Sequence, residues 1–116
     1  MTNPVRNACS FLFVPATQPE RLPKALASGS DMVIADWEDA VAPADKERAR
    51  AALAEAVVAL PHAQRARLLV RINSEGTPWF STDLQALAQL IAQGVAGAVV
   101  PKAERVHTLQ LSLIPV

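Results

Sequence analysis

The chain has 116 residues, 51% of them hydrophobic, and its 11 lysine and arginine residues are balanced by 11 aspartate and glutamate residues. That apolar share is enough for the core of one small domain and argues against disorder. The balanced charge argues against binding to nucleic acid phosphates or to an anionic membrane surface. We therefore expect a globular protein with neither a nucleic acid nor a membrane as its partner.

The sequence also limits the cellular compartment and the kinds of metal site. Its apolar runs are shorter than the roughly 20 residues that a membrane-spanning helix needs, and residues 1–6 lack the apolar core of a signal peptide. We expect a soluble, cytoplasmic protein. Cys9 is the single cysteine, and His62 and His107 lie far apart in the sequence. Any metal site in this chain would therefore have to use carboxylates.

Four apolar, strand-like runs alternate with stretches in which apolar residues have helical spacing. The runs cover residues 11–15, 32–39, 68–73 and 98–104, and a fifth begins at 113–116. Helices are predicted over residues 22–27, 45–60 and 82–93, the first after a turn over 19–21. The alternation predicts βαβ units, and hence a parallel sheet in an α/β fold.

The predicted second and third helices have distinct faces and ends. The second has an apolar side, and its charged residues, among them Lys46 and Arg50, are expected to face water. Ser81 or Thr82 is expected to cap the start of the third helix. Gly94 is expected to end that helix in a left-handed conformation.

The apolar runs end in polar residues, and this pattern predicts a barrel. Buried parallel strands with charges at their carboxyl ends are typical of one rim of a (β/α)8 barrel, where such enzymes place their sites. Because a complete barrel has eight strands, we predict that residues 1–116 are the N-terminal part of a single TIM-barrel domain, with the barrel incomplete. The residues expected to fill its interior are Leu12, Val14, Ile34, Val70 and Val99.

Asp36, Glu38 and Asp39, here called the acidic cluster, place three carboxylates at the end of the second run. Their mutual repulsion requires a nearby cation, a metal or shifted pKa values. The functional interpretation is a catalytic or metal-associated group. The alternative is that one carboxylate caps the next helix while the others are solvated.

Arg71 interrupts an otherwise apolar run, so its guanidinium must have a partner. Its planar fork suits a bidentate contact with a carboxylate, from either a substrate or the acidic cluster on the neighbouring strand. A purely structural ion pair is the alternative.

Two other strand ends carry polar side chains. Asn73 precedes a loop of turn-forming residues, 74–79, that could close over a ligand. Lys102 and Glu104 follow the fourth run, where the lysine could meet a carboxylate or a phosphate. An ordinary exposed Lys/Glu pair is an equally good interpretation.

Five short segments together resemble the citrate lyase β-subunit-like group of the HpcH/HpaI aldolase superfamily. They are SFLFVP at 10–15, PER at 19–21, DWEDAV with PADK at 36–46, VRIN at 70–73 and PKAE at 101–104. The resemblance implies a (β/α)8 barrel that uses Mg2+ to cleave or form a carbon–carbon bond in a 3-hydroxyacyl thioester, such as citryl-, malyl- or citramalyl-CoA. The products would be an acetyl-type thioester and an oxo acid.

The resemblance also implies roles for the catalytic residues. Arg71 would hold the carboxylate or oxo group of the substrate, while Mg2+ stabilises the developing negative charge. Glu38 and Asp39 match the acidic pair beside the metal, where they would orient Arg71 or a metal-bound water.

Binding residues follow from the same resemblance. Asn73 and Lys102 are expected to help bind the substrate, and Arg21 and Lys24 to contact the phosphates of coenzyme A. The Mg2+ ligands are expected beyond Val116, so the isolated chain is expected to be inactive. A homo-oligomer is expected as well.

Departures from the family pattern at Cys9, Ala16 and Trp37 leave the substrate open. The competing interpretation is a non-catalytic half-barrel that binds ligand weakly or associates with itself. A third is a barrel enzyme for a phosphorylated substrate, which would need a glycine-rich loop after the late strands.

Overall fold

The computed structural model describes residues 10–101 and the backbone of 113–115. Its strands form one parallel sheet in chain order: β1 (Phe11–Pro15), β2 (Met32–Asp36), β3 (Leu68–Arg71), β4 (Gly97–Val100) and β5 (Leu113–Pro115). The helical segments between them are η1 (Pro19–Arg21), α2 (Leu22–Leu26), η2 (Pro43–Asp45), α3 (Lys46–Val58), α4 (His62–Arg65) and α5 (Phe80–Ala92). No helix in the described part is both long and apolar enough to span a lipid bilayer.

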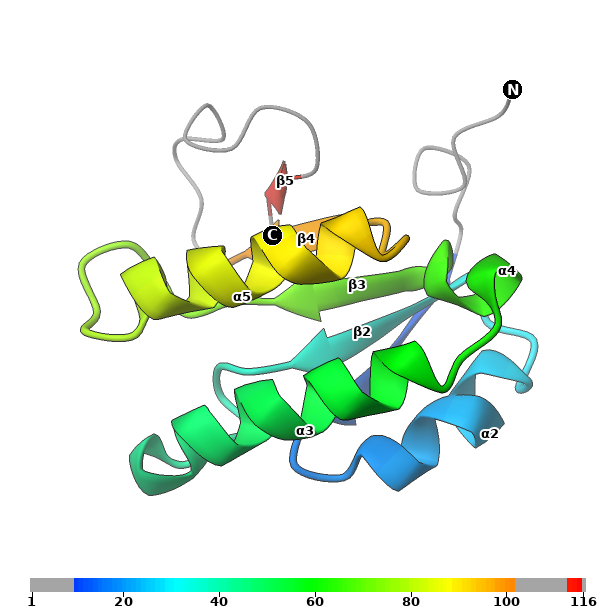
Figure 1. The fold of residues 1–116 in the computed structure, drawn as a ribbon, viewed down its shortest axis with the longest axis horizontal. Coiled ribbons are helices and arrows are strands. Elements are labelled where there is room, and N and C mark those ends of the chain that lie inside the picture. The colour runs from blue at the N-terminus through cyan, green and yellow to red at the C-terminus, as the bar shows by residue number, and fades with distance from the viewer. Residues whose placement is uncertain (1–9, 102–112, 116) are drawn as a thin grey trace.

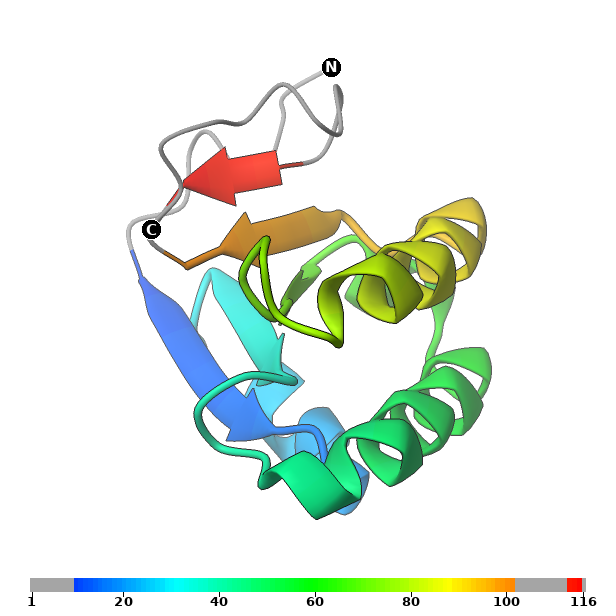
Figure 2. The ribbon, with the colours of Figure 1, turned by 90° about the vertical axis from the view of Figure 1, so that its left-hand side faces the viewer.

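Helices α2, α3 and α5 cover one face of the sheet (Figure 1). Figure 2, which looks toward the carboxyl ends of the strands, shows this layering from the end. The main core lies between sheet and helices, where Val33, Val70 and Ala98 pack with Leu53 of α3 and Leu87 of α5. This layering is that of βαβ units joined by crossover helices.

A smaller cluster occupies the other face of the sheet. It consists of Met32, Ile34, Leu69 and Val99, which alternate along their strands with the residues of the main core.

The predicted barrel interior is therefore only partly correct. Ile34 and Val99 lie on the face away from the helices, but Val14 and Val70 belong to the helix-covered core. Leu12 is 37% exposed. The error arises because strands that are apolar on both faces carry no alternation from which to read their orientation.

Most of the predicted helices are confirmed. The turn over 19–21 is η1, and α2 begins at Leu22 as expected. Gly94 ends α5 with φ +108°, while its N–H donates to Ile91 O (3.0 Å) and the N–H of Val95 donates to Leu90 O (3.1 Å). These two bonds form the Schellman motif that a left-handed glycine permits.

Two details differ from the predictions. The predicted cap at Ser81 or Thr82 is wrong, because α5 begins at Phe80 and has no side-chain cap. Helix α4 was not predicted, because a single helical turn is too short to show periodicity in the sequence. Arg65 of α4 donates to the carbonyls of Leu60 and Val58, so it satisfies acceptors near the end of α3.

Candidate active site

Asp36 and Arg71 lie next to each other at the carboxyl ends of β2 and β3. The parallel register pairs them directly. Side chains alternate along a strand, so Asp36 shares the face of Ile34 and Arg71 shares the face of Leu69, away from the helices. The ladder thus places a charged pair at one end of an apolar surface.

The guanidinium of Arg71 makes a bidentate contact with Asp36. Nε donates to Oδ1 (3.0 Å) and Nη2 donates to Oδ2 (2.7 Å). The guanidinium lies over the ring of Phe13, with Cζ 4.8 Å from the ring centroid. Arg71 is thus held along one edge and against one face, while its side chain keeps 18% of its surface exposed.

The rest of the acidic cluster surrounds this pair at longer range. Arg71 Nε lies 3.5 Å from Glu38 Oε1, and Nη2 lies 4.0 Å from Asp39 Oδ2. The Asp39 side chain is 81% exposed. The structure therefore brings Arg71 to the acidic cluster, although its short bonds go to Asp36 and not to Glu38 or Asp39.

Asp36 also holds the turn that follows β2. Its carboxylate accepts the N–H of Glu38 (2.8 Å) and the N–H of Ala40 (3.1 Å). Neither η2 nor α3 has a side-chain cap. The alternative that a carboxylate of the acidic cluster caps the next helix is therefore wrong.

These contacts move the pKa values of the cluster in opposite directions. Burial by itself raises the pKa of Asp36, but the hydrogen bonds from Arg71 and from the N–H of Glu38 outweigh it and lower that pKa. Burial and the charge of Asp39 raise the pKa of Glu38. The hydrogen bond to Asp36 raises the pKa of Arg71. Asp36 is thus the fixed anion, and Glu38 is the acid that takes up a proton more easily.

A cavity of about 260 Å³ lies beside the acidic cluster. Its walls include Glu38 and Asp39 from the segment after β2, and Asn73 and Trp79 from the segment after β3. A concave surface of this kind suits a small molecule, and it borders two carboxylates of the acidic cluster, although Arg71 and Asp36 do not line it.

Asn73 is buried, and its side-chain amide group donates to Asp83 Oδ2 (2.6 Å) and to Trp37 O (3.2 Å). These donors are therefore used inside the protein, and contact between Asn73 and a substrate stays a prediction. Lys102 lies outside the described residues, so its expected role stays a prediction as well. Arg21 and Lys24 are exposed on η1 and α2, and neither lines the cavity beside the acidic cluster.

The expectation that Lys46 faces water is wrong. Lys46 is only 5% exposed, and Arg50 is hydrogen bonded to Asp83 (2.8 Å). Asp83 did not stand out in the sequence, because a polar residue in the first turn of a helix usually faces solvent. One signal was present for Lys46, which ends the PADK segment that contributes to the family resemblance.

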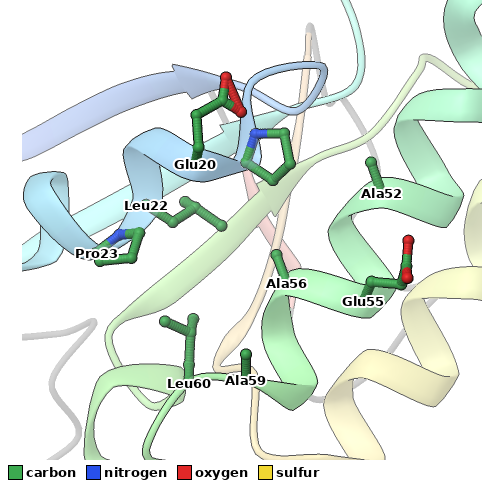
Figure 3. A pocket seen from close by; sticks show the side chains of 9 residues that line it. Glu20, Leu22, Pro23, Ala52, Glu55, Ala56, Ala59 and Leu60 are labelled. Carbon is green, nitrogen blue, oxygen red and sulfur yellow. The ribbon is translucent and has the colours of Figure 1, made fainter.

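A second hollow, of about 390 Å³, lies on the helix-covered side between α2 and α3. Figure 3 shows that its walls are mainly apolar, with Leu22 and Leu60 near Ala56 and with Glu20 and Glu55 at its edges. None of the predicted site residues lines it. It is separate from the candidate active site.

A family model described as HpcH/HpaI aldolase/citrate lyase matches residues 9–112. A (3S)-malyl-CoA thioesterase of Cereibacter sphaeroides is 34% identical over 108 residues, which are 91% of this chain and 36% of the relative. A citrate lyase subunit beta-like protein of Mycobacterium tuberculosis is 43% identical over 94 residues, 81% of this chain and 31% of the relative. An L-malyl-CoA/beta-methylmalyl-CoA lyase of Cereibacter sphaeroides is 38% identical over 96 residues, 83% and 30% of the two chains.

Solved structures agree with these matches. The citrate lyase beta subunit of Mycobacterium tuberculosis complexed with oxaloacetate and magnesium superposes with a TM-score of 0.76 at 38% identity, covering 98% of this chain and 49% of that one. CitE of the same organism, with magnesium, acetoacetate and coenzyme A, gives a TM-score of 0.73 at 38% identity, covering 95% and 40%. The predicted α/β barrel-type fold is confirmed. The chain spans about a third of the length of these curated relatives.

Proposed function

The chain belongs to the HpcH/HpaI aldolase/citrate lyase family, and from that premise we propose that its protein is a carbon–carbon lyase acting on a 3-hydroxyacyl-CoA thioester. The relatives named as malyl-CoA lyase and citrate lyase beta-like protein support a substrate of the malyl, citramalyl or citryl kind. The proposed products are an oxo acid and an acetyl-type thioester.

The observation that carries this proposal is that the Arg71 guanidinium is held in place and keeps one edge unused by Asp36. Its contact with Asp36 uses Nε and Nη2, which leaves the edge formed by Nη1 and Nη2 for a second carboxylate or an oxo group. Phe13 and Asp36 fix the plane of the guanidinium. A planar donor that is fixed before the ligand arrives loses little freedom on binding.

Glu38 and Asp39 are proposed to influence the position of the Arg71 guanidinium and the approach of a ligand to it. Glu38 lies at the same Nε that Asp36 accepts from, so its charge helps to keep the guanidinium in place. Because Asp39 is mostly exposed, it is available to repel or orient an incoming group.

Mg2+ is proposed as the cofactor on the strength of the solved relatives that contain it. Among the described residues, no three Asp, Glu, His or Cys side chains are grouped so that they could hold a metal ion. Asp36 is already committed to Arg71 and to two backbone N–H groups. The residues described here do not fit Mg2+ by themselves, so we assign no step of the reaction to it.

Coenzyme A is proposed as the acyl carrier, since one solved relative holds it. Arg21 and Lys24 are proposed to contact its phosphates because both are exposed cations on the segment that follows β1. Lys102 and Asn73 are proposed to bind the substrate. A homo-oligomer is also proposed, and sizing chromatography with light scattering tests it.

The test of function compares two proteins: this chain and, where the reading frame continues past Val116, the longer product. Each is given malyl-, citramalyl- and citryl-CoA with and without Mg2+, and the oxo acid, acetyl-CoA and free CoA are measured separately. The expected result is oxo acid with acetyl-CoA from the longer product only. Cleavage by neither protein, together with weak or no binding of oxaloacetate, would favour the non-catalytic half-barrel that binds ligand weakly or associates with itself.

Thioester hydrolysis is the second candidate, favoured by the relative named (3S)-malyl-CoA thioesterase. It differs in a measurable product. Hydrolysis of malyl-CoA releases free CoA and malate without breaking the carbon chain, whereas the lyase releases glyoxylate and acetyl-CoA.

A further inference from the structure

Four polar residues form a second hydrogen-bonded group next to the candidate active site, and two of them, Lys46 and Asn73, also line the cavity beside the acidic cluster. We call Lys46, Arg50, Asn73 and Asp83 the buried network. Asp83 is 0% exposed, and it accepts from Arg50 Nη1 (2.8 Å), Asn73 N (2.8 Å) and Asn73 Nδ2 (2.6 Å). One carboxylate thus ties α3, α5 and the segment after β3 together.

Lys46 extends this network to the segment after β2. Its ammonium group donates to Trp37 O (2.8 Å) and to Glu38 O (2.8 Å), and it lies over the ring of Trp79, 5.0 Å from the centroid. The Asn73 amide donates to the same Trp37 carbonyl (3.2 Å). The two segments that border the acidic cluster are therefore joined through one carbonyl oxygen.

These bonds hold the backbone just beyond the point where β2 and β3 stop pairing, next to the acidic cluster. The β2–β3 ladder ends at the pair Asp36–Arg71, followed only by the bond from Trp37 N to Arg71 O (2.9 Å). Beyond that point, the Asn73 bond to Trp37 O connects the two segments. The Lys46 bond to Glu38 O ties the segment after β2 to α3, and the Asn73 bond to Asp83 ties the segment after β3 to α5. They set where the backbone of Glu38 lies relative to Arg71.

The chemistry of the network also favours a positioning role over a purely stabilising one. Burial of an ammonium group is unfavourable unless hydrogen bonds replace its water, and an apolar residue of similar size would often serve stability as well. A lysine with two directional bonds to consecutive carbonyls fixes the path of the backbone, which an apolar side chain does not.

We propose that Lys46 and Asp83 are positioning residues, which hold the segments after β2 and β3 so that Glu38 stays within reach of Arg71. Lys46 acts through the backbone of Glu38, and Asp83 acts through Asn73. The proposal rests on the proposed function only in taking Arg71 as the group that binds the ligand.

The experiment compares Lys46→Met with Arg48→Met in this chain. Both changes remove one cation from α3, but the Arg48 side chain is 70% exposed and its ion pair in the described part of the chain is with Asp45 (3.2 Å). The first measurement is the NMR signal and hydrogen exchange of the Arg71 Nε–H, which donates to Asp36 Oδ1 (3.0 Å) and whose nitrogen lies 3.5 Å from Glu38 Oε1. The second is the affinity for oxaloacetate in the presence of Mg2+, and the third is the melting temperature.

Lys46→Met is expected to shift the Arg71 Nε–H signal, speed its exchange and weaken oxaloacetate binding at least fivefold. Arg48→Met is expected to leave the signal in place and the affinity within twofold. Asp83→Asn, which keeps the shape of the side chain, is the second variant and is expected to act in the same direction. If Lys46→Met does not fold, the Asp83→Asn variant tests the proposal by the same measurements.

An unchanged Arg71 signal in the folded variants would overturn the proposal, whatever happens to the melting temperature. A lower melting temperature with unchanged signal and affinity would make the network structural only. If the unmodified chain binds no oxaloacetate, the ligand-binding role of Arg71 in this chain fails. The Arg71 signal still decides whether Lys46 and Asp83 position it.

Discussion

Two buried arginine–aspartate pairs within residues 10–101 differ in what surrounds them. Arg50 and Asp83 join α3 to α5 on the helix-covered side, 2.8 Å apart. Arg71 and Asp36 lie on the other face of the sheet, 2.7 Å apart. In both pairs the arginine is mostly covered and the aspartate almost completely so. Distance and burial therefore do not distinguish them.

The balance of donors and acceptors does distinguish them. The oxygens of Asp83 are taken by Arg50 and Asn73, and no other carboxylate lies within 4.0 Å of Arg50 in the described part of the chain. Arg71 has three carboxylates around it and a guanidinium edge that Asp36 does not use. An ion pair alone does not mark a functional site, but an unbalanced one beside a cavity is a good candidate.

The largest expected effect is on the balanced pair. Asp83→Leu leaves Arg50 and the N–H groups of Asn73 without their acceptor, so we expect the free energy of unfolding to fall by about 3–5 kcal/mol. Urea denaturation measures it. Asp36→Leu is expected to cost less, because Glu38 and Asp39 remain near Arg71.

A double variant sharpens this prediction. Arg50→Met together with Asp83→Leu removes both charges, so part of the lost stability is expected to return. If the double variant is as unstable as the sum of the single variants, the pair is not coupled and the comparison fails.

The second prediction concerns Arg71→Lys. A lysine keeps the charge but not the fork, so kcat/KM of the longer product is expected to fall at least tenfold, which corresponds to about 1.4 kcal/mol of lost transition-state stabilisation. The kinetics are measured beside urea denaturation of the same protein. Arg48→Lys, on the exposed side of α3, is the control. Unchanged kinetics would make Arg71 a structural residue.

The third prediction uses pH. Because the pKa of Asp36 is lower in the folded protein than in the unfolded chain, its contribution to stability is fully present above the unfolded pKa and is lost as the pH falls through the folded pKa. The pKa of Glu38 is raised, so protonation of Glu38 partly offsets that loss. The free energy of unfolding of Asp36→Asn should therefore approach that of the original protein in acid. A constant difference across the acid range would contradict a lowered pKa of Asp36 in the folded protein.

The smallest effect on stability is expected from Glu38→Gln and Asp39→Asn. Their contacts with Arg71 are long and partly solvated, so each change should alter the free energy of unfolding by about 1 kcal/mol or less. The loss of turnover by the longer product, expressed as an activation free energy, should be larger than this loss of stability. Thermal melts and kinetics on the same samples separate the two effects, and equal losses would favour a structural ion-pair network.

The sequence by itself determined the order of strands and helices, the parallel sheet and the need of Arg71 for an acidic partner. These follow from local properties. Apolar runs between helical stretches have few other ways to pair. A guanidinium in an apolar strand must have a partner. Gly94 adopts a φ of +108° that other residues avoid.

The tertiary structure alone decided which face each strand residue occupies and which carboxylate Arg71 uses. Because β2 is buried at every position, its apolar pattern did not show that the face shared by Ile34 and Asp36 lies away from the helices while Val33 faces them. The register then selected Asp36 over Glu38 and Asp39. The burial of Lys46 and Asp83 likewise depends on helices and loops distant in the sequence, a dependence that local patterns do not record.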